Sequence, residues 1–474
     1  MVPGDPLDKN RTGPTPPRPS QDPDPGPDPA LDGRGPDADG ATGDGGGRPG
    51  GWWRRHRARR TRHRDAVRSR RTVVGRHPRT TVLVLVVLLL SPLLVSMVSA
   101  ATDVSLGSTP GARLTEWVRD HGGRGLVVWA EDAWYSHHAP PKGGRPPAGA
   151  IPAPVPGALS PSTSPSPSPS PAPSVSPSVS PAPAPAPVGP PHLPAPAPLT
   201  PFASPPIPGE GQWHPVGRDV DGVPAVYEAF LRPNATNTSL VTGVAWMDTT
   251  LLSATLYAGS SIPGTGGPWT DTAPLRAPAT DSLVAAFNSG FRMQDADGGY
   301  YADGRVAARL RTGAASLVIY RDGVATVADW GRDASMGPDI AAVRQNLDLI
   351  VDGGRPVPGL VDDDFARWGF TVGNKIQVWR SGLGVTADGA LVYVGGSGLS
   401  IVDLADILQR AGAVRAMELD INTAWVNFFS FAPPAGEPAA PSNGSKLTAD
   451  ETQWVGRYFA PCSRDFITMS ARLS

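Results

Sequence analysis

Residues 209–474 are predicted to form an α+β domain, built on a mixed β-sheet with few helices. β-Hairpins are indicated at residues 321–323 and 388–389, where Asp-Gly turns join apolar runs. Helices are indicated after Pro338 and at Ser400, where apolar residues recur at intervals of three and four. Because strands outnumber helices and about 260 residues can bury a sizeable core, we expect one strand-rich domain.

The segments before this domain differ sharply in composition. The chain of 474 residues contains 57 Pro and 55 Gly, too many for a chain that is packed throughout. We divide the N-terminal part into five segments: 1–53, a disordered tail rich in Pro, Gly and Asp; 54–80, an Arg-rich juxtamembrane segment; 81–101, a transmembrane helix; 102–139, a membrane-proximal segment; and 140–208, a Pro/Ala/Ser linker.

The uncharged run at 81–101 has the length of a helix that spans a bilayer. Twelve arginines precede it between Arg54 and Arg79, and this asymmetry predicts a cytoplasmic N-terminus. We therefore expect a single-pass protein of the cell membrane with its C-terminal domain outside the cell. The alternative is a cleaved signal peptide, because residues 98–100 resemble a cleavage site.

The arginine run, read alone, is also typical of a tail that binds nucleic acid. Arginines next to a membrane span are better explained by topology and by attraction to anionic lipids, so no nucleic-acid partner is expected. The linker at 140–208, extended at roughly 3.1 Å per residue, would hold the domain some 200 Å from the membrane.

A helix followed by a strand is expected at the centre of the domain. Ser400 and Asp403 form a pair typical of a capping box, and Gly412 ends the helix. Apolar side chains then alternate with polar ones over residues 413–422, which is typical of a strand. We predict that this strand is central because it is strongly apolar on one face.

The polar face of that strand carries the main candidates for catalysis. Glu418 and Asp420 are two residues apart, so their Cα atoms would lie about 7 Å apart on one face. Asn422 continues the same face, and Trp425 begins an aromatic loop. The alternative to a functional carboxylate pair is a solvated or salt-bridged face.

Other polar residues interrupt apolar surroundings and are candidates for substrate binding. Asn288 ends an apolar run, Arg332 follows a tryptophan, and Arg380 with Ser381 lies within a predicted strand. An arginine suits a phosphate or carboxylate, and an amide suits a sugar hydroxyl. The alternatives are that Asn288 caps a turn, that Arg332 pairs with a neighbouring acid, and that Arg380 is a surface side chain.

Several classes of site are disfavoured by the residues that are missing. There is no Gly-rich phosphate loop and no Cys pair, since Cys462 is the sole cysteine. His192 and His214 are the only histidines after His138, which argues against a serine–histidine hydrolase and a zinc site. The aspartates at 362–364 are explained more simply as an acidic loop than as a calcium site. We expect no metal or cofactor, and the remaining carboxylates, amides and arginines suit hydrolysis of a sugar linkage.

Three stretches, in this order, resemble the phosphodiester glycosidase family over roughly residues 240–431. AAFNSGF at 285–291 resembles the family's Asn-Gly-Gly-Phe turn, and WRSGLGVTADGALVYV at 379–394 resembles its Arg-Thr/Ser strand and following hairpin. LSIVDLADILQRAGAVRAMELDIN at 399–422 resembles the helix before its Leu-Asp-Gly-Gly-Gly-Ser strand end. This chain departs from the last motif, because Ile-Asn-Thr at 421–423 replaces the glycines and the serine.

The resemblance implies hydrolysis of a sugar-1-phosphodiester, and the expected topology suggests a cell-envelope or extracellular glycan as the substrate. It implies that Asp420 is the nucleophile or general base, and that Glu418 raises its pKa or acts as the acid. Arg380 would hold the phosphate, and Asn288 and Asn422 would hold sugar hydroxyls. The other candidates for substrate binding are Arg332, Ser381 and Trp425. Retention or inversion stays open, and the alternative function is a tethered, non-catalytic module that binds glycan.

Overall fold

The computed structural model describes residues 78–474, except 108, 124, 128, 131–138, 154–190, 265–266 and 473–474. The expected tail at 1–53, most of the Arg-rich segment at 54–80 and the middle of the linker at 140–208 lie outside the described residues. The chain divides into two units between Leu85 and Val86. All the sheets and the site described below belong to the second unit.

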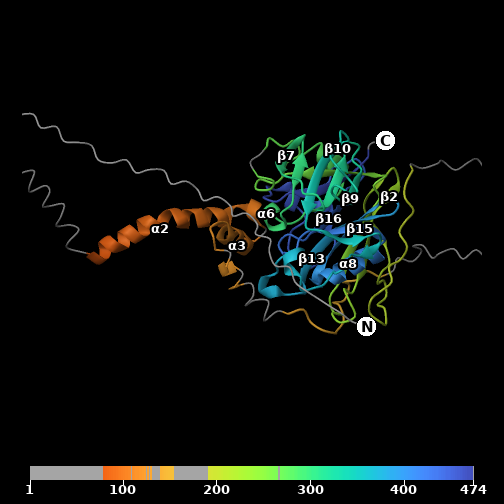
Figure 1. Cartoon of the computed structure of the whole chain (residues 1–474), viewed down its shortest axis with the longest axis horizontal. Coiled ribbons are helices and arrows are strands. Elements are labelled where there is room, and N and C mark those ends of the chain that lie inside the picture. The colour runs from red at the N-terminus through yellow and green to blue at the C-terminus, as the bar shows by residue number, and fades with distance from the viewer. Residues whose placement is uncertain are drawn as a thin grey trace, which may run out of the picture. The chain divides into compact units, whose positions relative to one another are not determined.

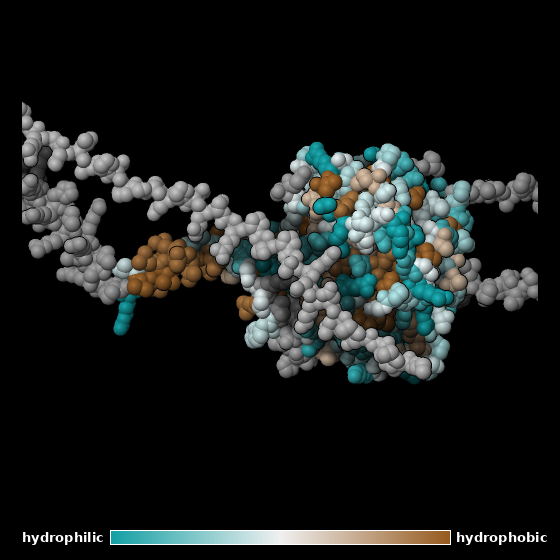
Figure 2. All heavy atoms as spheres, in the orientation of Figure 1, coloured by the Kyte–Doolittle hydropathy of each residue, from teal (hydrophilic) through white to brown (hydrophobic). Residues whose placement is uncertain are grey.

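Helix α2 (Pro78–Thr102) coincides with the predicted transmembrane segment. Residues Arg79–Thr102 are long and apolar enough to cross a membrane, and apolar side chains cover their surface (Figure 2). Length and composition of this kind also fit a signal sequence.

The strands of the domain form three sheets (Figure 1). In order across the sheet, the largest contains β1 (His214–Val220), β2 (Val223–Leu231), β3 (Thr242–Met247), β14 (Leu391–Leu399), β13 (Val378–Thr386), β15 (Ala413–Glu418), β11 (Leu349–Asp352) and β12 (Arg355–Pro356). The second contains β17 (Gly444–Lys446), β16 (Phe428–Phe431), β5 (Leu283–Asn288), β18 (Phe466–Ala471) and β4 (Leu252–Tyr257). The third contains β7 (Arg305–Ala308), β6 (Tyr300–Ala302), β10 (Ile340–Asn346), β8 (Ala315–Tyr320) and β9 (Ala325–Asp329).

Helices are few and mostly short, which confirms the predicted α+β class. The α-helices after α2 are α3 (Pro110–Asp120), α5 (Ala279–Ser282), α6 (Met293–Ala296), α7 (Phe365–Trp368) and α8 (Ile401–Arg410). The 3₁₀ turns are η1 (Val104–Leu106), η2 (Val372–Asn374), η3 (Pro441–Asn443) and η4 (Arg457–Phe459). The ladders between the described strands are all antiparallel, so the sheets are antiparallel and not mixed as predicted, because neighbouring strands are joined largely by hairpins.

The helix–strand unit predicted at the centre of the domain is confirmed. The Ser400 hydroxyl accepts a hydrogen bond from the Asp403 amide, and the Asp403 carboxylate accepts one from the Ser400 amide. These two bonds begin α8, which lies beside β13 and β15 (Figure 1) and buries Leu404 and Leu408 against the largest sheet. This packing fixes the position of β15, at whose end Asp420 lies.

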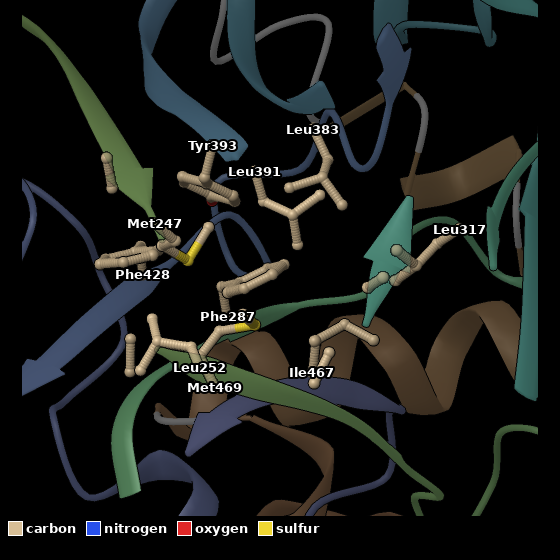
Figure 3. Packing of buried hydrophobic residues seen from close by; sticks show 14 of the residues in the cluster. Met247, Leu252, Phe287, Leu317, Leu383, Leu391, Tyr393, Phe428, Ile467 and Met469 are labelled. Carbon is tan, nitrogen blue, oxygen red and sulfur yellow. The ribbon is translucent and has the colours of Figure 1, made fainter. Parts of the chain in front are cut away.

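The main hydrophobic core lies where the inner faces of the three sheets meet (Figure 3). Phe287 of β5 packs 5.3 Å from Tyr393 of β14 and 5.8 Å from Phe428 of β16, measured between ring centroids. Leu317 of β8 and Met247 of β3 complete the contact between sheets. Aromatic pairs at these distances add to the free energy gained from burial, so the core holds the ends of β5, β13 and β15 in fixed positions.

The hairpin predicted around residues 321–323 is confirmed by the pairing of β8 with β9. The helix predicted after Pro338 is wrong, because residues 340–346 form strand β10 between β6 and β8. The three-to-four spacing of Ile340 and Val343 is compatible with both structures. Hydrogen bonding to a strand on each side decides in favour of the sheet, which is a tertiary effect.

Both described ends of the linker predicted at 140–208 contact the domain. The Pro141 carbonyl accepts a hydrogen bond from Asn237 Nδ2 at 2.9 Å, and the Leu193 amide donates to Asp248 Oδ2 at 2.7 Å. The described parts of the predicted linker are therefore held against the domain by hydrogen bonds.

Candidate active site

Asp420 lies just beyond the end of β15, where the chain still pairs with β13. The Ser381 amide donates to the Asp420 carbonyl at 2.8 Å, and the Leu419 amide donates to the Ser381 carbonyl at 2.8 Å. Asp420 Oδ1 then accepts the Asn422 amide at 2.9 Å, and this contact turns the chain away from the strand. The carboxyl group is thus held in a fixed place, and Asp420 as a whole is 3 % exposed.

A cavity of about 360 Å³ opens beside this carboxyl group. Phe291, Phe370 and Ile421 give it apolar surface. It also contains three cationic and three acidic side chains, namely Arg119, Arg292, Arg464, Asp120, Asp295 and Asp420. A pocket with balanced charge and an apolar wall suits a ligand that carries both an anionic group and a less polar part.

Arg464 is the arginine best placed to bind an anion next to Asp420. Its guanidinium lies 4.6 Å from the ring centroid of Trp425, which supports it from one side. Its Nη1 atom is buried and finds no hydrogen-bond partner among the described residues. A buried donor without a partner is costly, so this atom marks the place where a ligand oxygen would be stabilised.

The electrostatic environment of Asp420 suits a base near neutral pH. Burial raises the pKa of Asp420 to about 6, while the charge of Arg464 and the hydrogen bond from Asn422 act in the opposite direction. Burial also lowers the pKa of Arg464, against the charge of Asp420. Asp420 is therefore largely ionised at pH 7, yet basic enough to accept a proton.

Asn288 and Ser381 lie behind Asp420 and do not belong to the described lining of the cavity. Asn288 Nδ2 donates to Ser381 Oγ at 3.0 Å, and Asn288 Oδ1 accepts the Tyr393 hydroxyl at 2.8 Å. Ser381 Oγ in turn accepts the Asp420 amide at 3.2 Å. This buried chain of hydrogen bonds fixes the backbone that carries the carboxyl group.

A side chain at the glycine of the AAFNSGF stretch would clash with its surroundings. Gly290 has a φ of +149°, and a Cβ atom there would lie 2.1 Å from the side-chain nitrogen Nδ2 of Asn346. The Asn346 side chain accepts the Phe291 amide and donates to the Ser289 carbonyl. A side chain at residue 290 would therefore displace the turn that places Phe291 in the cavity.

Glu418 and Arg380 pair with each other inside the domain. Arg380 donates from Nη1 to Glu418 Oε1 and from Nε to the Leu399 carbonyl, and both side chains are at most 1 % exposed. Burial raises the pKa of Glu418 to about 7, although Arg380 opposes the shift. Neither residue is among the described residues that line the Asp420 cavity, so the structure does not bring Arg380 to the position predicted for a phosphate ligand.

The other candidates fall in three different places. Asn422 lines the cavity beside Asp420, while Trp425 is buried under Arg464. Arg332 forms ion pairs with Asp333 and Asp352 on the surface, and it is absent from the described lining of the cavity. The alternative weighed for Arg332, pairing with neighbouring acids, is the arrangement that the structure shows.

Sequence reasoning missed Arg119, Arg292 and Arg464, which the structure brings to the cavity from three distant segments. A signal for Arg464 exists, because the polar run Ser463 to Asp465 directly precedes apolar strand β18. That strand pairs with β5, so the run meets the end of β5 near Asn288. The pairing itself is not readable from the sequence.

Comparison with known proteins gives one family match and several distant structural similarities. The model of the phosphodiester glycosidase family matches residues 281–420, which start just before β5 and end at Asp420. A search of curated proteins found no match.

Among solved structures, this chain is similar to the zebrafish N-acetylglucosamine-1-phosphodiester alpha-N-acetylglucosaminidase catalytic domain auto-inhibited by its pro-peptide. The identity is 13 %, the TM-score is 0.34, and the match covers 55 % of this chain and 88 % of that one. A hypothetical protein from Synechocystis is similar at 13 % identity and a TM-score of 0.26, over 53 % and 63 % of the two chains. Residues 281–420 of this chain thus match the model of the phosphodiester glycosidase family.

Proposed function

We propose that this domain hydrolyses a sugar-1-phosphodiester, with Asp420 at the sugar carbon and Arg464 at the phosphate. The observation that carries the proposal is their meeting in one cavity, a carboxylate beside a buried guanidinium Nη1 that has no partner among the described residues. A carboxylate next to an anion-binding donor suits attack at a sugar carbon whose leaving group is a phosphate.

This reaction needs less protonation of the leaving group by a general acid than ordinary glycoside hydrolysis does. The leaving group is a phosphate monoester, whose second pKa is about 6, so it departs as a stable anion. Arg464 stabilises the charge that develops on it. Asp420 either attacks the sugar carbon or removes a proton from the attacking water, and the anomeric form of the first product distinguishes the two.

The neighbouring residues then have supporting roles. Asn422 lines the cavity and can hold a sugar hydroxyl. Ser381 and Asn288 position the Asp420 backbone through their hydrogen bonds. Glu418 acts through its position next to Asp420, since its charge and that of Asp420 interact.

We further propose that α2 anchors the chain in the cell membrane, with the arginines at 54–80 on the cytoplasmic side and the domain outside. The support is the apolar helix and the one-sided distribution of charge. The natural substrate would then be a glycan of the cell envelope or the extracellular space.

The direct test of the proposed hydrolysis uses the full-length chain in detergent with N-acetylglucosamine-1-phosphodiester and other sugar-1-phosphodiesters, and measures free sugar. No release from any of them, with sugar still bound, would favour the glycan-binding module instead.

Arg464→Gln is expected to lower kcat/KM by about 10²–10³-fold, the usual cost of one donor to a developing oxyanion. It should also move the acidic limb of the pH profile of kcat/KM, which is expected near pH 6 in the wild type because burial raises the pKa of Asp420 to about 6. Asp420 must be ionised to act, and the Arg464 charge lowers its pKa, so the limb should shift to higher pH. An unchanged limb would show that Arg464 does not act on Asp420. Arg464→Lys keeps the positive charge and should leave the acidic limb at the pH of the wild type.

A further inference from the structure

A second cavity lies between the second and third sheets, apart from the one at Asp420. Its volume is about 260 Å³, and its described lining comes from β4, β6, β8 and β10, from the loop at 269–271 and from the turn at 321–323. No residue of this described lining also lines the Asp420 cavity. The proposed hydrolysis therefore leaves the groups of this second cavity unused.

The outer edge of β4 faces this cavity. β4 is the last strand of the second sheet, and β18 lies on its other side. The amides of Ala254 and Ala258 both point away from β18, because the first donates to the Gly323 carbonyl at 2.8 Å and the second to the Asp271 carbonyl at 2.9 Å. Backbone groups alternate in direction along a strand, so the amide and carbonyl of Leu256 point the same way.

Leu256 therefore offers one backbone donor and one backbone acceptor to the cavity. The residue lines the cavity, and neither of these groups has a hydrogen-bond partner among the residues that the structure describes. The edge is covered on both sides of it, at Ala254 and at Ala258, so the gap is one residue wide. Because backbone groups in the interior are costly without a partner, a polar ligand in the cavity would be stabilised by both.

An aromatic ring forms part of the wall. Trp269 is half-buried in the lining and packs edge-on against the buried ring of Tyr300, at 5.5 Å between centroids. The Thr270 amide donates to Asp303 Oδ2 at 2.7 Å, and this bond holds the loop that carries Trp269. An aromatic ring held in place at a cavity suits the apolar face of a sugar ring.

The charged groups of this cavity disfavour an anion. The described lining contains three aspartates and one arginine. Burial raises the pKa of Asp271, and the nearby charge of Asp303 raises it further. The third aspartate, Asp322, serves its own turn, where it accepts the Val324 amide. Carboxylates accept hydrogen bonds from hydroxyl groups, while the Leu256 N–H group would face a bound metal ion unfavourably. The lining therefore suits a neutral ligand rich in hydroxyl groups.

We infer that this cavity is a second, non-catalytic site that binds a neutral sugar unit of a glycan. The apolar face of the sugar lies on Trp269, and its hydroxyl groups donate to Asp271 and Asp303. The free amide and carbonyl of Leu256 bond to the edge of the ring. Such a site holds the domain on a glycan chain and raises the effective concentration of that glycan. Binding here does not depend on the proposed hydrolysis.

The test measures binding of four sugars to the full-length protein in a detergent without sugar groups, by ligand-observed NMR titration. Three are neutral, the methyl glycosides of glucose, galactose and N-acetylglucosamine, and the fourth is glucuronic acid. We expect at least one neutral glycoside to bind with a Kd of about 1 mM. Glucuronic acid should bind at least about tenfold more weakly, because Asp271 and Asp303 repel its carboxylate. Binding of none of the neutral glycosides, or equal binding of glucuronic acid, would overturn the inference.

Two variants distinguish this cavity from the one at Asp420. Trp269→Ala is expected to raise the Kd of the best-bound glycoside about tenfold or more, as loss of an aromatic anchor often does. The matched control is Trp454→Ala, which removes a tryptophan of 48 % exposure outside the described lining of both cavities and should leave the Kd unchanged.

Asp271→Asn keeps the shape of the side chain and tests the same site without removing a ring. It should narrow the difference in Kd between the neutral glycoside and glucuronic acid several-fold, because one repelling charge is lost. Sugar binding that neither Trp269→Ala nor Asp271→Asn alters would place the sugar elsewhere and overturn the inference. The readout is binding alone, so this result and the test of hydrolysis at Asp420 can fail separately.

Discussion

Asp420→Asn is expected to lower kcat/KM for sugar release by about 10²–10⁴-fold, the range typical of a lost acid–base group. The amide has the shape of the carboxyl group, and its oxygen can still accept the Asn422 amide. It can neither attack the sugar carbon nor take a proton from water. The measurement is free sugar released per unit time over a range of substrate concentrations.

The matched control for this variant is Asp322→Asn. Asp322 Oδ1 accepts the Val324 amide at 3.0 Å, the same two-residue turn that Asp420 makes with Asn422, but it lies at the exposed β8–β9 hairpin. Its activity should equal that of the wild type, and both variants should melt close to the wild-type temperature. Full activity of a folded Asp420→Asn would remove Asp420 from the mechanism and leave the reaction in place.

Glu418→Gln is expected to lower the free energy of unfolding by about 3–5 kcal/mol, because it leaves the Arg380 charge buried without its partner. Both side chains are at most 1 % exposed, so water cannot replace the lost carboxylate. The measurement is denaturant unfolding of the full-length chain in detergent, followed by tryptophan fluorescence.

Two further variants test whether the loss of stability comes from leaving a buried charge without its partner. The double variant Glu418→Leu with Arg380→Met removes both charges, and it should recover most of the lost stability, as replacement of buried ion pairs by apolar residues often does. Arg332→Gln breaks ion pairs whose arginine side chain is 49 % exposed, and it should cost at most about 1 kcal/mol. If Glu418→Gln lowered the free energy of unfolding no more than Arg332→Gln does, the buried pair would not contribute to the stability of the domain.

Local chemistry made several features of this chain predictable. Ser400 and Asp403 cap α8 because their side chains satisfy each other's backbone amides, and this needs no distant partner. The Asp-Gly turns form hairpins for the same reason. Asp420 could be chosen as a candidate because it follows an apolar strand after a well-capped helix, and the apolar run at 81–101 forms a helix by length and composition.

The pairing of distant segments decided the rest. Residues 340–346 carry spacing that fits helix and strand alike, and the neighbours β6 and β8 made them a strand. Glu418 and Asp420 were expected on one face of a strand. Because β15 ends at Glu418, Asp420 turns into the cavity while Glu418 stays inside with Arg380.

Three arginines show why the sequence alone could not identify the arginine next to Asp420. Arg380, Arg332 and Arg464 are chemically identical in the sequence, and each is preceded or followed by polar residues. Glu418 neutralises the first, surface aspartates hold the second, and the pairing of β18 with β5 delivers the third to Asp420. A sequence determines which groups can bind an anion, but which of them keeps a free donor depends on the partners that the fold brings to it.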